Sequence, residues 1–136
     1  MGQVLAMTVK IVQNWLPQSK YYFKASYDMQ PKGIIVHNTA GSASAMEEAN
    51  RMISNNSPIS FHVAIDEKEA VECIPFSRNA WHAGDGGYGF ANRNLIGIEI
   101  ARSTSPQDLY LKAEANAVVY VAGVLKQYGW GVDKLY

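Results

Sequence analysis

The segment NLIGIEIA, residues 94–101, constrains the fold more than any other part of the sequence. Ile96, Ile98 and Ile100 alternate with residues that, apart from Glu99, are also apolar or small. The shorter run GIIVH, residues 33–37, is apolar on both faces in the same way. Strands of this kind are buried on both faces, as in sheets that are covered by helices on each side. We therefore expect an α/β protein with a largely buried sheet.

The remaining patterns place helices and further strands between and after these two segments. Ser44 and Glu47 have the spacing of a capping box, which predicts a helix over residues 44–54. Alternation predicts a strand over 59–66, in which Ile59, Phe61, Val63 and Ile65 share one face, and a hairpin partner follows at 70–76. Apolar residues at helical spacing predict a long closing helix between Pro106 and Gly129. Residues 84–94 are predicted to be a long loop, and the chain before residue 31 has a loop-like composition.

Length and composition indicate one globular domain and exclude several classes of protein. The 136 residues include twelve basic and twelve acidic side chains without a basic cluster, so we expect no nucleic-acid partner. The single cysteine, Cys73, cannot form an internal disulfide and is interpreted as a small buried apolar residue. Residues 1–16 lack the pattern of a signal peptide, and no apolar run approaches a membrane span, so we expect synthesis in the cytoplasm and no membrane insertion.

Two residues are candidates for chemistry because of where they stand in these strands. His37 ends its strand beside a small polar turn, where an imidazole can ligate a metal or simply form a hydrogen bond. Glu99 lies in an apolar strand, where desolvation raises a carboxyl pKa as a general base requires, although an ion pair or an outward-facing carboxylate remains open. His82, beside Trp81 and several glycines, is expected to line a cleft, and His62 to be a hydrogen-bonded structural residue.

The motifs VHNTAG, SFHVAID, NAWHAGDG and NRNLIGIEI occur in this order and are followed by the long helix. Together they resemble the zinc-dependent N-acetylmuramoyl-L-alanine amidases of the amidase-2 type, a family that includes peptidoglycan recognition proteins. More narrowly, the sequence is similar to the N-terminal catalytic domain of endolysins from phages or prophages of Gram-positive bacteria. The resemblance extends from about residue 11 to the last residue, and it implies a single domain with a mixed central β-sheet flanked by helices.

The resemblance also implies a reaction and a role for each matching residue. Peptidoglycan is the implied partner, and the implied reaction cleaves the amide between N-acetylmuramic acid and the L-alanine of the stem peptide. His37 matches the first zinc ligand, and Glu99 matches the general base that acts on zinc-bound water. The positions that match residues lining or supporting the substrate groove are Asn38, Thr39, Trp81, His82, Arg93 and Asn94.

Two departures from the family pattern change the expectation for this chain. Phe61 stands where some relatives have a tyrosine close to the metal, so Glu99 has to carry the acid–base work. The family's two other zinc ligands follow the closing helix, and residues 1–136 do not include the matching segment. A catalytic zinc needs about three protein ligands, so we expect this chain to bind zinc weakly or not at all and to be inactive alone.

Three accounts of the incomplete ligand set remain open from the sequence. The chain is a fragment of a longer amidase, a muropeptide-binding module that does not cleave, or one part of a site completed by a second polypeptide. The resemblance further implies action on the cell wall after release through a membrane lesion made by another protein, of the holin type. Without the family's closing strand, a sheet edge stays uncovered, so we expect homo-oligomerisation or low stability.

Overall fold

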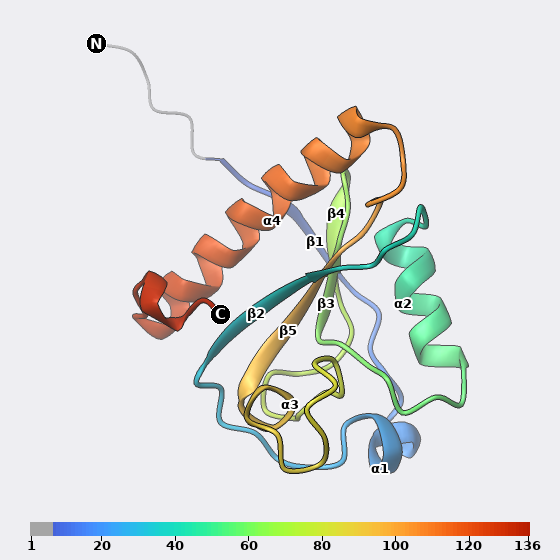
Figure 1. Ribbon diagram of the computed structural model, residues 1–136, viewed down its shortest axis with the longest axis vertical. Helices are drawn as coiled ribbons and strands as arrows, with labels where there is room; N and C mark the ends of the chain where they lie inside the picture. Colours follow the sequence, from blue (N-terminus) through green and yellow to red (C-terminus); the bar gives the residue numbers. More distant parts are fainter. Residues whose placement is uncertain (1–6) are drawn as a thin grey trace.

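A computed structural model describes residues 7–136, which form one five-stranded sheet with helices on both faces (Figure 1). The sheet order is β1-β4-β3-β5-β2, which places β5 near the centre and β2 at one edge. The first part of the segment considered for a signal peptide, residues 1–6, lies outside the described residues. The strands are β1 (Lys10–Gln13), β2 (Gly33–Asn38), β3 (Val63–Ile65), β4 (Glu69–Glu72) and β5 (Leu95–Ile100).

The pairing of the strands makes the sheet mixed, which confirms the predicted fold class. β5 is parallel to both of its neighbours, β2 and β3, while β3 and β4 form the predicted antiparallel pair. β1 completes the sheet by pairing parallel to β4. Helix α4 covers one face of β5, and the loop that carries His82 packs against Gly97 on the other face, which explains why most residues of β5 are apolar or small on both faces.

The two helical layers bury different sets of side chains. The long helix α4 (Gln107–Tyr128) packs Ala117, Tyr120, Val121 and Val124 against one face of the sheet. Helix α2 (Ala45–Ser54) covers part of the other face with Ala45, Ala49 and Met52. Figure 1 shows α4 and α2 on opposite sides of the strands. The predicted stop of α4 is confirmed, because Gly129 has a φ of 67°, a left-handed conformation that suits glycine.

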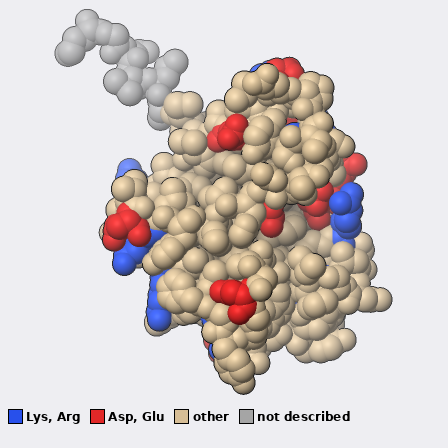
Figure 2. Space-filling model, viewed as in Figure 1, with Lys and Arg blue, Asp and Glu red and all other residues tan. Residues whose placement is uncertain are grey.

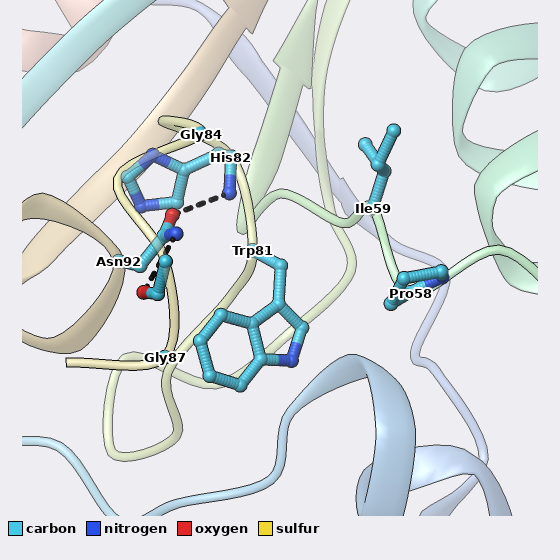
Figure 3. Close-up of a pocket in the computed structure, with 8 residues that line it drawn as sticks. Pro58, Ile59, Trp81, His82, Gly84, Gly87 and Asn92 are labelled. Carbon is cyan, nitrogen blue, oxygen red and sulfur yellow. Dashed lines mark hydrogen bonds between the residues drawn. The ribbon is translucent and has the colours of Figure 1, made fainter. Parts of the chain in front are cut away.

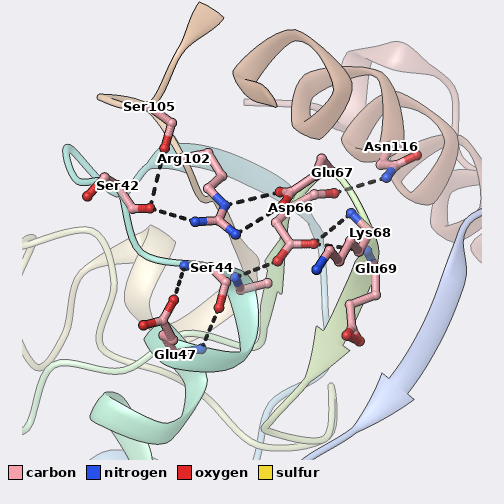
Figure 4. A network of polar contacts seen from close by, with 11 residues as sticks. Ser42, Ser44, Glu47, Asp66, Glu67, Lys68, Glu69, Arg102, Ser105 and Asn116 are labelled. Atoms are coloured by element: carbon pink, nitrogen blue, oxygen red, sulfur yellow. Dashed lines mark hydrogen bonds and ion pairs between the residues drawn. The ribbon is translucent and has the colours of Figure 1, made fainter. Parts of the chain in front are cut away.

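The start of α2 is held by two independent polar contacts. Ser44 and Glu47 form the predicted capping box, with each side chain bonded to the backbone N–H of the other residue. Asp66, buried after β3, accepts a hydrogen bond from the Ala45 N–H at 2.8 Å. Figure 4 shows this network continuing to Arg102, whose guanidinium bonds both carboxylate oxygens of Glu67 and the Ser42 carbonyl. The loops at the carboxyl ends of β2, β3 and β5 are thereby tied together.

The structure differs from the sequence-based prediction at the strand predicted over residues 59–66. Only Val63–Ile65 forms a strand, and Ile59 projects into solvent with 68% of its surface exposed. Phe61 also does not share a face with Val63, because it packs on the α2 side while Val63 packs on the α4 side. The backbone of residues 57–59 is bonded instead to the buried side chain of Lys24, which prevents it from continuing the ladder.

Other differences concern short elements. β1 lies in the stretch predicted to be a loop, and the predicted loop over 84–94 ends in helix α3 (Phe90–Asn94). Asp85 caps α3 by accepting hydrogen bonds from the N–H groups of Ala91 and Asn92. The remaining elements are helix α1 (Tyr21–Lys24) and two 3₁₀ helices, η1 (Gln18–Lys20) and η2 (Val132–Lys134).

The surface in Figure 2 carries charged side chains of both signs in small separate groups. Over residues 7–136, none of the helices is both long enough and apolar enough to span a membrane.

Candidate functional site

His37 and Glu99 lie side by side on the face of the sheet opposite α4. They are register partners in the parallel pair β2–β5, and Ala64 of β3 is the next partner in the same row. The neighbouring residues Val36 and Ile98 point to the α4 side, so alternation directs His37 and Glu99 to the other side. The sheet therefore brings together the two residues that the sequence singled out for chemistry.

The Glu99 side chain lines a small hollow at the carboxyl end of β5. The hollow has a volume of about 190 Å³, and we call it the Glu99 hollow; it is lined by Asn38, Thr39, Glu48, Ile59, Phe61 and Glu99. Burial raises the pKa of the Glu99 carboxyl to about 7, and the negative charge of Glu48 adds to the effect. A carboxyl group with this pKa can accept and release a proton near neutral pH, as a general base must.

His37 presents a ring nitrogen without a hydrogen-bond partner. Its Nε2 atom is buried and unpaired within residues 7–136, and burial lowers the pKa of the imidazole. The Thr39 hydroxyl, two residues further along, is also buried without a partner there. Buried polar atoms are nearly always paired in folded proteins, so these atoms are suited to an external partner such as a metal, water or substrate.

His62 is a structural residue, as the sequence suggested. Its Nε2 lies 2.7 Å from the Arg78 carbonyl and therefore donates, and its Nδ1 accepts from the Gly97 N–H at 3.0 Å. Burial lowers the pKa of the ring to about 3, so it stays neutral. Both nitrogens are occupied, which leaves no lone pair for a metal.

A larger pocket lies beside the Glu99 hollow. It has a volume of about 520 Å³, and we call it the Trp81 pocket; it is lined by Pro58, Ile59, Trp81, His82, Gly84, Gly86, Gly87 and Asn92. Figure 3 shows the Trp81 ring between the loop that carries His82 and the segment of Pro58 and Ile59. The Asn92 amide oxygen accepts from the N–H groups of His82 and Ala83, which fixes that loop. His82 thus lines a cleft, as its sequence context indicated.

The His82 ring is packed closely against the sheet. Its Nε2 donates to the Leu95 carbonyl, while Nδ1 is buried without a partner within residues 7–136. Burial lowers the pKa of the ring to about 4. A Cβ atom placed on Gly97 would come within 2.4 Å of this ring, so only glycine allows the approach.

The other predicted site residues are placed at the edge of this region. Arg93 and Asn94 line neither the Glu99 hollow nor the Trp81 pocket. The guanidinium of Arg93 lies 3.8 Å from the Tyr27 ring centroid and donates to the Gly87 carbonyl, so it supports the loop beside the Trp81 pocket. Asn94 bonds the Phe90 carbonyl within α3. Cys73 is buried, and burial raises the pKa of its thiol to about 12, so it does not act as a nucleophile.

The donor atoms near His37 do not make a complete zinc site. No cluster of three or more His, Cys, Asp or Glu side chains able to hold a metal ion occurs within residues 7–136. A catalytic zinc needs about three protein ligands. The unpaired Nε2 of His37 fits one of them, and the described residues do not supply the rest.

Sequence reasoning missed Glu48, Ile59 and Asn92. Glu48 reaches the Glu99 hollow from α2, and only the packing of that helix shows its proximity. Ile59 was assigned to the same face of a strand as Phe61, Val63 and Ile65, and not to a site. Asn92 lies in a loop-like sequence. No local sequence pattern indicates that its amide oxygen accepts hydrogen bonds from the N–H groups of His82 and Ala83.

Comparison with solved structures identifies the class of domain that has this fold and site. The chain superposes on the PlyG catalytic domain with a TM-score of 0.87 at 44% identity, covering 93% of this chain and 76% of that one. It superposes on PlyL with a TM-score of 0.88, also at 44% identity, covering 95% and 79%. The fold is that of endolysin catalytic domains.

Sequence comparison gives the family. Residues 27–135 match the family model described as N-acetylmuramoyl-L-alanine amidase, and the chain belongs to this family. The chain is 45% identical over 129 residues to the N-acetylmuramoyl-L-alanine amidase CwlA of Bacillus subtilis. The matched segment is 95% of this chain and 47% of CwlA, so the chain spans about half the length of that relative.

Proposed function

We propose that the chain forms the catalytic part of a peptidoglycan hydrolase that cleaves the amide between N-acetylmuramic acid and L-alanine. The observation that carries this proposal is the placement of Glu99, whose pKa is about 7, beside the unpaired Nε2 of His37 on one face of the sheet. The names of CwlA and the matching family model support the choice of substrate.

In this proposal, Glu99 moves the protons of the reaction. Its ionised carboxylate takes a proton from the water that attacks the amide carbonyl carbon, and later gives a proton to the leaving amine of L-alanine. Phe61 lines the same hollow and has no hydroxyl, so it excludes water without sharing in proton transfer. Burial, with a smaller contribution from the negative charge of Glu48, raises the pKa of Glu99 to about 7, so the protonated form exists near neutral pH.

The other predicted residues take positioning roles in the proposal. Asn38 and Thr39 contact the reacting part of the substrate in the Glu99 hollow. Trp81 and His82 contact the adjoining part of the ligand in the Trp81 pocket. Arg93 and Asn94 act through the loop and helix that border this pocket.

Amidases of this family are generally zinc-dependent, and we assign His37 as one zinc ligand. The remaining ligands come from outside residues 7–136, because those residues lack a sufficient cluster. They belong to a longer chain or to a second polypeptide. Calorimetric titration of the 136-residue chain with Zn²⁺ tests this assignment: we expect weak binding that His37→Ala abolishes, and tight binding at one zinc per chain contradicts it.

The activity is tested in a chimera that supplies the remaining residues of a relative. Residues 1–136 replace the matching segment of CwlA, and release of new N-terminal L-alanine from purified cell walls is measured. We expect the chimera to free the N-terminal amino group of L-alanine in the stem peptide, and the Glu99→Gln chimera to lose this activity. The isolated chain is expected to be inactive under the same conditions, and the appearance of new N-terminal L-alanine with the isolated chain would contradict the incomplete ligand set.

A second function, muropeptide binding without cleavage, is favoured by one observation, the incomplete ligand cluster around His37. In that case, the isolated chain binds muropeptides with an affinity that a chelator leaves unchanged, and the chimera with CwlA produces no new N-terminal L-alanine. Either function places the chain at the bacterial cell wall. For the native protein, we propose action on the cell wall after release through a holin-type lesion.

We also propose that the chain self-associates through the region of β2. This strand is at the sheet edge, and the backbone of Tyr136 pairs with it only at Ile34. An apolar groove of about 430 Å³ lies beside it, between Val36 and Ile100 of the sheet and the Val118 face of α4. Sedimentation at increasing concentration tests this proposal, and a monomer throughout the range would contradict it.

A further inference from the structure

Ile59 occupies an unusual place for an exposed apolar residue. Its side chain is 68% exposed, yet it lines both the Glu99 hollow and the Trp81 pocket. It also borders a third depression of about 190 Å³ next to Met52 and Asn55. Because both cavities share Ile59, a ligand that extends from the Glu99 hollow into the Trp81 pocket passes this side chain. Figure 3 shows Ile59 at the edge of the Trp81 pocket.

The backbone that carries Ile59 is fixed by a buried cation. The Nζ atom of Lys24 donates to the Asn55 side-chain oxygen at 2.8 Å, to the Ser57 carbonyl at 2.5 Å and to the Ile59 carbonyl at 3.5 Å. The Ile59 N–H in turn donates to the Ser57 hydroxyl at 3.2 Å. Lys24 is fully buried, so these bonds hold the loop in one conformation.

A second set of contacts fixes the distance between Ile59 and Trp81. The N–H of Ser60 donates to the Trp81 carbonyl, and the Ser60 hydroxyl accepts from the Trp81 N–H at 2.9 Å. The same hydroxyl donates to the Lys24 carbonyl. Ile59 and Trp81 are therefore presented by one rigid unit, which is the arrangement that binding sites require.

We propose that Ile59 is a specificity residue that contacts the substrate at the junction of the two cavities. This inference rests on the proposed function. In the muramoyl–alanine linkage, the lactyl group on one side of the amide and the alanine on the other each carry a methyl group. The Ile59 side chain packs against one or both of these methyl groups, so the preorganised apolar surface is buried only when the ligand is bound.

The test measures binding of N-acetylmuramoyl-L-alanyl-D-isoglutamine to the 136-residue chain by calorimetry, with ligand integrity checked by mass spectrometry. Ile59→Ser is expected to weaken binding about ten-fold or more, and Ile59→Val about two- to four-fold, from the apolar area removed. Leu111→Ser is the matched control, because Leu111 is 53% exposed on α4, on the other face of the sheet, and lines none of the cavities described above. Its affinity is expected to equal that of the wild-type chain.

Ligand analogues separate a direct contact from an indirect effect. One analogue carries glycine in place of L-alanine, and the other lacks the lactyl methyl group. The wild-type chain is expected to bind one or both about four-fold more weakly than the parent ligand, and Ile59→Ser is expected to lose that discrimination. Thermal unfolding of each variant checks that the fold is retained, which is expected because Ile59 is exposed.

Each outcome decides between the two proposals. If the wild-type chain binds the muropeptide and Ile59→Ser binds equally well, the role of Ile59 is wrong while the proposed function stands. If Ile59→Ser weakens binding but still discriminates the analogues, the contact with the methyl groups is wrong. If neither the wild-type chain nor the chimera with CwlA binds the muropeptide, the proposed function is contradicted, and the role of Ile59 is overturned with it.

Discussion

Replacing Asp66 with alanine should destabilise the fold more than any surface substitution. The buried Asp66 carboxylate accepts three backbone hydrogen bonds, from Ala45 at 2.8 Å, Lys68 at 2.8 Å and Glu69 at 3.0 Å. These bonds join the start of α2 to the turn between β3 and β4. The carboxylate also lies at the positive end of the dipole of α2.

The expected loss follows from the groups left without a partner. Removing a charged acceptor costs about 1–3 kcal/mol for each buried N–H that stays unpaired. Water can reach the partly buried N–H groups of Lys68 and Glu69 more easily than the buried one of Ala45. We therefore expect Asp66→Ala to lower the free energy of unfolding by about 3 kcal/mol in total, a large share of the roughly 5–15 kcal/mol typical of a domain.

The free energy of unfolding is measured by urea titration followed by circular dichroism. Asp66→Asn keeps one acceptor oxygen and is expected to lose about 1–2 kcal/mol. Asp133→Ala is the control, because the Asp133 side chain is 75% exposed and makes only a 3.8 Å ion pair with Lys134; its change should be below about 0.5 kcal/mol. A loss below about 1 kcal/mol for Asp66→Ala would refute the reasoning.

The other predictions concern the histidines, the carboxyl pair and the glycine of the site. Because the pKa values of His62 and His82 are lowered to about 3 and 4 from 6.5, unfolding takes up protons below pH 6.5. The free energy of unfolding should therefore decrease as the pH is lowered below 6.5, by up to about 1.4 kcal/mol per pH unit for each histidine. Glu99, whose pKa is raised from 4.5 to about 7, has the opposite effect between those pH values, so the loss of stability should become steeper below pH 4.5. Urea titrations in which the free energy of unfolding does not decrease as the pH is lowered would contradict this prediction. In the chain without added metal, carbon NMR should give a midpoint near pH 7 for Glu99, and Glu48→Gln should lower it; an unchanged midpoint would exclude the proposed charge effect. Gly97→Ala should destabilise the fold by about 2 kcal/mol or more through its clash with His82 and shift the His82 ring resonances; unchanged stability and spectra would contradict the close packing.

The elements predicted correctly are those with a strong local pattern. β5 and β2 are apolar on both faces, and α4 repeats apolar residues over 22 residues. β1 was missed because it is a four-residue edge strand with mostly exposed side chains. α3 was missed because its start depends on Asp85, whose contacts form in the folded loop.

The site was predictable to the extent that it depends on strand alternation and family motifs. His37 and Glu99 fall on one face because their strands are parallel and in register, and both strands were predicted. The positions of Glu48 and Ile59 depend on contacts between distant segments. For Ile59, a lysine 35 residues earlier in the chain determines the conformation, and no local pattern carries that information.

The central claim is that Glu99 on this sheet face is the base for amide cleavage. The most direct test measures the rate at which the chimera with CwlA produces new N-terminal L-alanine on stem peptides. The account predicts that Glu99→Gln lowers this rate by about 100-fold or more, while the variant keeps its fold and its affinity for muropeptide. A Glu99→Gln chimera that retains more than about a third of the rate would contradict the account, since loss of a general base costs far more than that.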